Sequence, residues 1–189
     1  MRPCWGRLWP SLVADREDLT PRVMEAVEAQ LRKRASPRVL RVAYRAGYLA
    51  LRPWWWVARP HTRGLKVVVR RGDDVLLLRH TYARRDQWDV PGGFLRPGED
   101  VEVALTRELR EELGVQPTRI TLIAELPSRV ERRRERLFVF VADVAPGARL
   151  TLSEAEIAAA RWAPHDALPP GTNTFSRRMV ARAYWDEFR

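Results

Sequence analysis

The feature that most restricts how this chain can fold is a stretch in its middle, from Gly92 to Val115. Two adjacent glycines open the stretch, and a run that is expected to be helical follows between positions 101 and 113. Within that run Glu108, Glu111 and Glu112 stand at positions i, i+3 and i+4. A helix turns by about 100° per residue, so their carboxylates gather on one face. The stretch therefore predicts a helix with three crowded carboxylates behind a glycine turn.

Apolar residues and glycines in the same stretch are expected to hold this helix in place. Three leucines form a stripe next to the carboxylates and predict packing against a sheet: Leu105, Leu109 and Leu113. Gly92 and Gly93 let the backbone turn tightly and bring a carbonyl close to a ligand. Gly114 is placed to cap the end of the helix.

The crowded carboxylates need a partner of opposite charge, because they repel one another. Hard oxygen ligands of this kind suit Mg²⁺ or Mn²⁺. Ordinary pairs of Glu and Arg on a surface helix would give the same spacing. The three glutamates alone therefore leave a metal site and a surface helix as alternatives.

The whole stretch resembles the Nudix box, G-x5-E-x7-R-E-U-x-E-E-x-G-U, in which U is a bulky apolar residue. Every defined position is filled, by Gly93, Glu99, Arg107, Glu108, Leu109, Glu111, Glu112, Gly114 and Val115. An accidental match over so many fixed identities is far rarer than a match to a short motif. The resemblance extends through the preceding Val-Pro-Gly-Gly and the segment from Glu156 to Trp162, and covers about residues 64–189.

This resemblance implies an α/β fold, the Nudix α/β/α sandwich with a mixed β-sheet. It implies a Mg²⁺-dependent pyrophosphohydrolase, with Mn²⁺ as a substitute, in which a metal-activated water attacks one phosphorus of a nucleoside diphosphate derivative. The expected substrate is a small molecule of the ADP-sugar or nucleoside triphosphate type. The metal would lower the pKa of the water and neutralise charge on the phosphates.

The resemblance also assigns roles to individual residues. Glu112 and Glu108 are the leading metal ligands, Glu111 supports them, and the carbonyl of Gly93 adds an oxygen. Arg107 is expected to pair with a carboxylate and to hold Glu108 in place. The catalytic set is thus Glu108, Arg107 and Glu112.

Two further acidic residues have open roles. The general base is expected to be either Glu108, within the box, or Glu156, which precedes a later strand. For Glu156 a solvated position is an equally good interpretation. Glu99 is expected to support the box structurally, rather than to contact the metal through water.

Substrate choice lies outside the box, and the signatures of known subgroups are incomplete here. Pro127 stands nearer to the box than the corresponding proline of ADP-ribose enzymes, and the NADH-type and coenzyme A motifs are missing. The candidate substrate-binding residues are Arg129 and Arg132, in an arginine-rich segment, and Trp88, with Tyr82 and Phe94 as other aromatics near the box. A solvated hairpin tip is the favoured interpretation of the segment 129–136.

The order of strand and helix patterns agrees with a mixed sheet covered by helices. Runs of apolar residues at 65–69 and 75–78 flank Arg71-Gly72-Asp73-Asp74 and predict a hairpin. Later strands are expected at about 118–125, 137–144 and 159–163, and a last helix at about 173–188.

Residues 1–62 differ from the remainder in charge. They hold 12 basic and 5 acidic residues, a balance of 12 − 5 = +7 within a total of +10. Prolines after Thr20 and Ser36 predict helices at about 21–34 and 37–51, followed by Trp54–Trp56. We expect a basic helical N-terminal extension, 1–62, before a Nudix hydrolase domain, 63–189.

The extension has several possible partners. Docking on the Nudix domain or on a second copy of the chain, in a homodimer, is favoured, because large exposed apolar patches are rare. A membrane surface or nucleic acid are the alternatives. The single Cys4 and the lack of a long uncharged run predict a cytoplasmic protein.

Two other functions are kept as alternatives to the pyrophosphohydrolase. One is a catalytically silent Nudix-fold module that senses a nucleotide or binds nucleic acid. The other is an enzyme that processes RNA ends and binds RNA through arginines, which strong salt dependence would reveal.

Overall fold

The structure is a computed structural model, and it describes residues 61–81, 87–128 and 134–185 together with five single residues: Ser36, Val39, Val42, Ala46 and Leu49. The last four of these five are helical and fall in the predicted helix at 37–51. The predicted helix at 21–34 and Trp54–Trp56 lie outside the described residues. The helical extension therefore stays a prediction.

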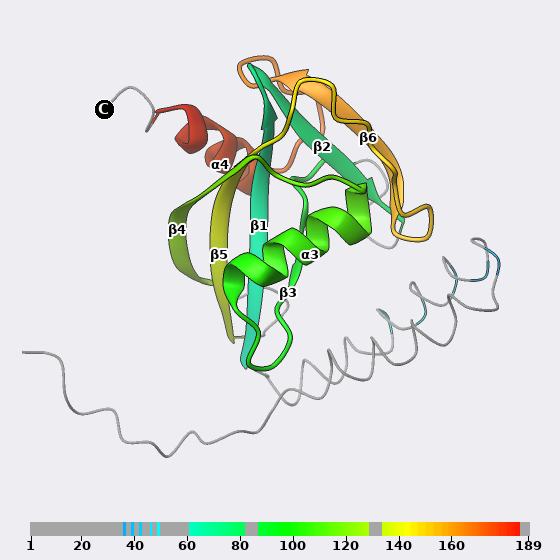
Figure 1. Cartoon of the computed structure of the whole chain (residues 1–189), viewed down its shortest axis with the longest axis vertical. Helices are drawn as coiled ribbons and strands as arrows, with labels where there is room; N and C mark the ends of the chain where they lie inside the picture. The colour runs from blue at the N-terminus through cyan, green and yellow to red at the C-terminus, as the bar shows by residue number, and fades with distance from the viewer. Residues whose placement is uncertain are drawn as a thin grey trace, which may run out of the picture.

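The described ranges contain strands and helices in mixed order (Figure 1). They are β1 (His61–Arg71), β2 (Asp74–His80), β3 (Gly92–Phe94), α3 (Val101–Leu113), β4 (Arg119–Ser128), β5 (Arg134–Asp143), β6 (Ile157–Pro164) and α4 (Thr174–Trp185).

The strands form one six-stranded sheet with the order β4-β5-β1-β2-β6, and β3 pairs with β1 outside this path. β1 and β5 are parallel, with Leu65 opposite Phe138, and the other strand pairs of the described ranges are antiparallel. Two strands share one edge of β1: β3 pairs with residues 64–66 and β2 pairs with residues 70–71. The sheet is mixed, as the sequence predicted.

The two faces of the sheet carry separate cores. Leu65 and Val67 of β1 pack into the core under α3, whereas Val68, which points the other way, packs into the core under α4. The helices contribute Leu105, Leu109 and Leu113 to the first core and Met179, Val180 and Ala183 to the second. Figure 1 shows α3 and α4 on opposite faces of the sheet. The expected α/β/α sandwich is confirmed.

Local signals at both ends determine the length of α3. The carboxylate of Asp100 accepts hydrogen bonds from the backbone N–H groups of Glu102, at 2.9 Å, and Val103, at 3.2 Å. At the other end Gly114 has a φ of 68°, a left-handed conformation that favours glycine. The predicted bounds and the predicted C-cap of this helix are confirmed.

The ends of β1 and β5 differ from the prediction because parallel pairing decides them. β1 begins at His61 rather than near Leu65, and its first residues pair with residues 134–136 of β5. The interpretation of the segment 129–136 as a solvated hairpin tip is wrong for residues 134–136, which extend β5. Residues 129–133 lie outside the described residues.

The last elements agree with the prediction within a few residues. β4 runs on to Ser128 through Pro127, which an edge strand tolerates because it lacks a partner on one side. α4 ends at Trp185, and residues 186–189 lie outside the described residues. Within the described ranges, the helices are too short or too polar to cross a lipid bilayer.

Candidate active site

Glu112 is the acidic side chain that lies deepest in α3. It is 3% exposed, and the backbone N–H of Gly92 interacts with its carboxylate and opposes the rise of its pKa. Its Oε2 atom accepts no hydrogen bond from the residues that the structure describes. A buried carboxylate oxygen without a partner is costly in free energy, so Glu112 fits the role of a ligand for a cation.

Gly93 brings the backbone of β3 directly against Glu108. A Cβ atom added at Gly93 would collide with the Glu108 carboxylate, so a larger residue would displace that carboxylate. Gly93 pairs with Leu65 of β1, which determines the position of β3 below α3. The close approach of a glycine backbone to this carboxylate agrees with the expected role of Gly93.

Arg107 connects Glu108 to the loop that precedes α3. Its Nη1 donates to Oε1 of Glu108 at 2.9 Å, while Nε and Nη2 donate to the two oxygens of Glu99, both at 2.9 Å. This two-pronged contact limits the orientations that the guanidinium can adopt. The expected pairing of Arg107 with Glu108 is present.

The carboxylate of Glu99 is hydrogen-bonded to groups of the protein. Its Oε2 also accepts the backbone N–H of Arg96 at 2.8 Å, so both oxygens have protein donors. Burial alone would raise the pKa of Glu99, but the hydrogen bonds from Arg107 and Arg96 hold it below its ordinary value. These contacts favour the structural role over a contact with the metal.

The acidic groups of α3 are only partly compensated by Arg107. Burial raises the pKa of Glu108 to about 7, although Arg107 opposes the shift. Burial, together with the charges of Glu108 and Glu156, raises the pKa of Glu112 well above its ordinary value, and Lys66 opposes this. A bound cation would reverse both shifts, because it favours the ionised carboxylates.

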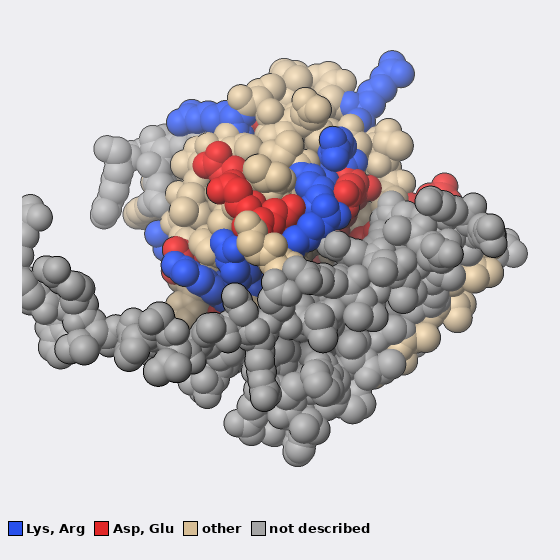
Figure 2. Space-filling view, turned by 60° about the horizontal axis from the view of Figure 1, so that its bottom comes forward, with Lys and Arg blue, Asp and Glu red and all other residues tan. Residues whose placement is uncertain are grey.

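Glu111 lies further from this centre than its sequence spacing suggested. Its side chain is 39% exposed, and its Oε2 is 3.5 Å from Nη1 of Arg107. Acidic and basic side chains lie next to one another on the face shown in Figure 2. Among the described residues, no group of three His, Cys, Asp or Glu side chains is arranged to hold a metal ion. The donors that converge are Glu108, Glu112 and the backbone of Gly93.

The loop before β6 brings Glu156 to the same centre. The backbone N–H of Ser153 donates to the carbonyl of Glu112 at 2.9 Å, and Thr81 donates its N–H to the carbonyl of Glu156 at 2.8 Å. The charge of Glu156 raises the pKa of both Glu108 and Glu112. The general base outside the box, which the sequence left open, therefore has a candidate close to the carboxylates.

Lys66 and Asp89 also belong to this part of the molecule, and the sequence did not single them out. Nζ of Lys66 donates to Oδ2 of Asp89 at 2.8 Å and to the carbonyl of Val90 at 3.2 Å. Lys66 lies opposite Gly92 in the pairing of β1 with β3. The only sequence signal was composition, since Lys66 is one of two lysines among 34 basic residues.

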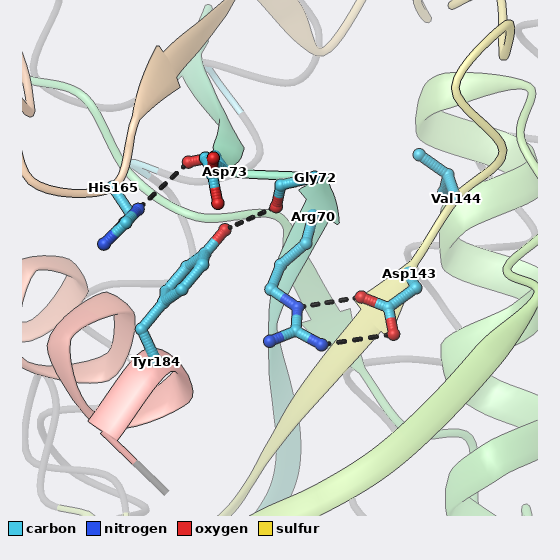
Figure 3. Close-up of a pocket in the computed structure, with 7 residues that line it drawn as sticks. All are labelled: Arg70, Gly72, Asp73, Asp143, Val144, His165 and Tyr184. Atoms are coloured by element: carbon cyan, nitrogen blue, oxygen red, sulfur yellow. Dashed lines mark hydrogen bonds and ion pairs between the residues drawn. The ribbon is translucent and has the colours of Figure 1, made fainter. Parts of the chain in front are cut away.

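A cavity of about 460 Å³ lies at the C-terminal end of β1, beside Arg70 (Figure 3). It is lined by Arg70, Gly72, Asp73, Asp143, Val144, His165 and Tyr184. Nε of Arg70 donates to Oδ1 of Asp143 at 2.8 Å, and the hydroxyl of Tyr184 donates to the carbonyl of Gly72 at 3.0 Å. None of the box carboxylates lines this cavity, so the candidate site is defined by the carboxylates and not by the cavity.

The family comparison decides what kind of domain carries these carboxylates. The family model described as the NUDIX domain matches residues 60–183. The chain belongs to the Nudix hydrolase family. The resemblance that the segment from Gly93 to Val115 suggested is therefore confirmed.

The curated relatives of this Nudix chain include NAD-capped RNA hydrolases. NudC of Klebsiella pneumoniae is 32% identical over 116 residues, which cover 60% of this chain and 44% of the relative. NudC of Vibrio vulnificus is 32% identical over 116 residues, which cover 60% of this chain and 43% of the relative. The chain thus spans less than half the length of these relatives.

Solved structures share the fold of this Nudix domain. The MutT NUDIX hydrolase from Burkholderia pseudomallei has a TM-score of 0.55 and 24% identity, and covers 65% of this chain and 97% of its own. The NUDIX domain of Shewanella oneidensis NrtR, complexed with ADP ribose, has a TM-score of 0.55 and 21% identity, with coverages of 75% and 97%. At this level of identity the likeness establishes the fold alone.

The candidate substrate-binding residues of this Nudix domain fall into two groups. Arg129, Arg132 and Tyr82 lie outside the described residues. Trp88 is 7% exposed in the core under α4, with the Arg79 guanidinium 4.2 Å from its ring centroid. Phe94, directly after Gly93, is 41% exposed. The aromatic side chain that reaches the surface next to the box is thus Phe94.

Proposed function

We propose that this chain is a Mg²⁺-dependent pyrophosphohydrolase that cleaves the diphosphate linkage of a nucleoside diphosphate derivative. The observation that carries the proposal is the buried carboxylate of Glu112, whose Oε2 has no donor among the described residues. Burial of such a group is costly, and a divalent cation offsets that cost. Family membership supports the same chemistry.

The proposed metal ligands are Glu112, Glu108 and the carbonyl of Gly93, with Glu111 in support. A bound divalent cation would neutralise charge on the phosphates and lower the pKa of an attacking water. Mn²⁺ is the expected substitute, because it also prefers oxygen ligands. The fit rests on the orphaned oxygen of Glu112 and on the backbone of Gly93 beside Glu108.

Side chains of the protein position the Glu108 carboxylate and accept a proton during the reaction. Arg107 keeps the Glu108 carboxylate in position and is itself held by both oxygens of Glu99. Either Glu108 or Glu156 accepts a proton from the attacking water. Glu156→Gln distinguishes the two: if Glu156 is the base, kcat falls while Mn²⁺ binding persists, whereas an unchanged kcat assigns the role to Glu108, which is also a proposed metal ligand.

The proposed substrate contains a diphosphate between a nucleoside and a further group. Two similarities support this class: relatives named NAD-capped RNA hydrolase, and a solved Nudix domain complexed with ADP ribose. NAD and ADP ribose both contain such a diphosphate. We propose that Phe94 contacts the base or sugar at the edge of the site, because aromatic faces stack on bases.

A panel of nucleotides tests the proposal. The full chain is incubated with ADP-ribose, NAD, NAD-capped RNA and nucleoside triphosphates, in Mg²⁺, in Mn²⁺ and in EDTA, and products are separated by chromatography. Hydrolysis that requires the metal and is lost in Glu112→Gln supports the proposal. Undiminished hydrolysis in Glu112→Gln contradicts it, and nucleotide binding without any product would point instead to a sensing module.

For residues 1–62 we propose a docking role, on the Nudix domain at 63–189 or on a second copy of the chain. A liposome sedimentation assay compares the full chain with a form that lacks residues 1–59, so that β1, which begins at His61, stays intact. Equal binding by the two forms would remove the alternative of a membrane anchor. Stronger binding by the full chain would contradict the docking proposal.

A further inference from the structure

We propose that Lys66 and Asp89 are positioning residues that hold the Gly92 N–H against the Glu112 carboxylate, and so tune divalent metal binding from the opposite face of the sheet. The inference rests on the proposed function, because it concerns the same metal site. It adds two residues that lie outside the box.

The ammonium group of Lys66 is the first connection. Lys66 follows Leu65 on β1 and therefore points to the face that α4 covers. Its Nζ donates to Oδ2 of Asp89 at 2.8 Å and to the carbonyl of Val90 at 3.2 Å. One side chain thus contacts two consecutive residues of the segment that leads into β3.

Asp89 is held from three directions, so it is not a flexible surface carboxylate. Its Oδ1 accepts the hydroxyl of Ser176, in the first turn of α4, at 2.5 Å and the backbone N–H of Val90 at 2.8 Å. Burial alone would raise the pKa of Asp89, but Lys66 and Ser176 hold it below its ordinary value. Asp89 therefore stays ionised and links β1 to α4.

The same segment is tied to both neighbouring strands through its backbone. Asp89 exchanges two backbone hydrogen bonds with Leu78 of β2, at 2.8 and 2.9 Å, and the carbonyl of Pro91 accepts the N–H of Val67 at 2.9 Å. The residue after Pro91 is Gly92, which lies opposite Lys66 in the β1–β3 pair. Any shift of residues 89–91 is therefore passed on to Gly92.

Gly92 completes the connection to the metal site. Its backbone N–H interacts with the Glu112 carboxylate and opposes the rise of its pKa, and Oε2 of the same carboxylate has no hydrogen-bond partner among the described residues. A Cβ added at Gly92 would lie 2.7 Å from Cδ of Lys66, so the stem of the lysine packs directly against this glycine. Lys66 thus supports the donor both by packing and through Asp89 and Val90.

The positioning role and a purely electrostatic role predict opposite effects of removing the charge of Lys66. The positive charge of Lys66 repels a cation at Glu112, so its loss would strengthen metal binding if charge alone mattered. If Lys66 positions the Gly92 N–H, its loss weakens metal binding, because the carboxylate loses its fixed orientation. The sign of the change separates the two roles.

The test uses the full chain and four variants: Lys66→Met, Lys66→Arg, Asp89→Asn and Arg71→Met as the matched control. Lys66→Met removes the ammonium group and keeps the length of the stem. Arg71→Met removes a positive charge from the same strand, where Arg71 makes a partly exposed ion pair with Asp74 at 3.7 Å. Mn²⁺ binding is measured by titration with electron paramagnetic resonance, and the Mg²⁺ dependence of turnover is measured in parallel.

The expected result is that Lys66→Met and Asp89→Asn raise the dissociation constant of Mn²⁺ by roughly tenfold to a hundredfold, the range for groups that orient metal ligands. Lys66→Arg should bind Mn²⁺ much more tightly than Lys66→Met. Arg71→Met should stay within about twofold, since partly exposed ion pairs contribute little. Circular dichroism and thermal unfolding confirm that each variant is folded under the conditions of the titration.

Unchanged or tighter Mn²⁺ binding by folded Lys66→Met would overturn the inference and leave the proposed function intact. Absence of Mn²⁺ binding by the unmodified chain would overturn the proposed function, and the inference with it. If Lys66→Met does not fold, Asp89→Asn decides, because the amide keeps the size of the carboxylate. Wild-type affinity in Asp89→Asn would then contradict the inference.

Discussion

Two regions along β1, around Arg70 at its C-terminal end and around Lys66 at its middle, differ in how their charges are compensated. Near Arg70 the charged groups compensate one another: Arg70 makes a two-pronged ion pair with Asp143, at 2.8 and 3.2 Å, and lies over the ring of Tyr184 (Figure 3). Near Lys66 the carboxylates of Glu108 and Glu112 are buried with incomplete compensation. Both regions are polar and partly buried, but of the two only the region around Lys66 has described carboxylates, those of Glu108 and Glu112, whose pKa values are raised.

This difference separates the paired charges around Arg70 from the proposed metal site. The charges around Arg70 are paired, and the contacts of Arg70 connect β1, β5 and α4. The pKa values of Glu108 and Glu112 are both raised, which is typical of sites that bind or react. The cavity of about 460 Å³ lies beside the paired charges around Arg70, and none of the box carboxylates lines it.

The largest expected effect is that of Glu112→Gln. Turnover should fall by about a thousandfold or more, because the metal loses a ligand whose effect on the barrier is several kcal/mol. Stability without metal should stay the same or rise, because the substitution removes a buried acidic group. Kinetics in Mg²⁺ and urea unfolding in EDTA measure the two effects, and a parallel loss of both would show that Glu112 is only structural.

Arg70→Met should lower stability and leave metal binding unchanged, the reverse of what is expected for Glu112→Gln. Removal of one partner from a largely buried ion pair costs about 2–3 kcal/mol in the free energy of unfolding, less than for a fully buried pair because Asp143 is partly exposed. Mn²⁺ affinity should not change. Urea unfolding and Mn²⁺ titration of the same preparation measure both quantities. Weakened Mn²⁺ binding would contradict the distinction between the regions around Arg70 and Lys66.

Glu99→Gln should have an intermediate effect on turnover, through the position of Glu108. Arg107 loses the two-pronged contact with Glu99, so Glu108 is held less firmly. Turnover should fall by roughly tenfold, at the low end of the range for groups that orient metal ligands. Steady-state kinetics at saturating Mg²⁺ measure the effect, with Glu102→Gln on the exposed face of α3 as the control. Equal activity of the two variants would contradict the role of Glu99.

The smallest effect concerns His80, whose pKa burial lowers to about 4 from an ordinary value of 6.5, with a further contribution from Lys66. Between these two values the unfolded chain binds a proton that the folded chain does not. Stability should therefore fall as the pH falls through this window, by about 1 kcal/mol from pH 7 to pH 5.5. Urea midpoints at both pH values measure the loss in the wild type and in His80→Gln. The same dependence in both proteins would exclude His80 as its source.

The sequence predicted α3 more accurately than the strands, for a physical reason. Asp100 and Gly114 cap this helix within its own segment, so local residues determine both ends. The start of β1 depends on pairing with residues 134–136, which are far away in sequence. Charge runs also misled the prediction, because residues 134–136 belong to a strand rather than to a solvated tip.

The residues of the candidate site were predictable where they lie close together in the sequence. Glu108 and Glu112 follow from spacing on one helix, and Gly93 follows from its position in the box. Glu156 was one of two candidates for the base, and the fold brings it close enough to raise the pKa of both carboxylates. Lys66 and Asp89 come from separate strands and loops, and no local pattern connects them to Glu112.

Direct measurement of Mn²⁺ binding tests the central claim, that the carboxylates of Glu108 and Glu112 beside the middle of β1 form a divalent metal site. The full chain and Glu112→Gln are titrated with Mn²⁺ and followed by electron paramagnetic resonance. The prediction is saturable binding to the unmodified chain that competes with Mg²⁺ and is strongly weakened in Glu112→Gln. Equal Mn²⁺ binding by the two proteins would contradict the account, because the buried carboxylate would then have no part in holding the metal.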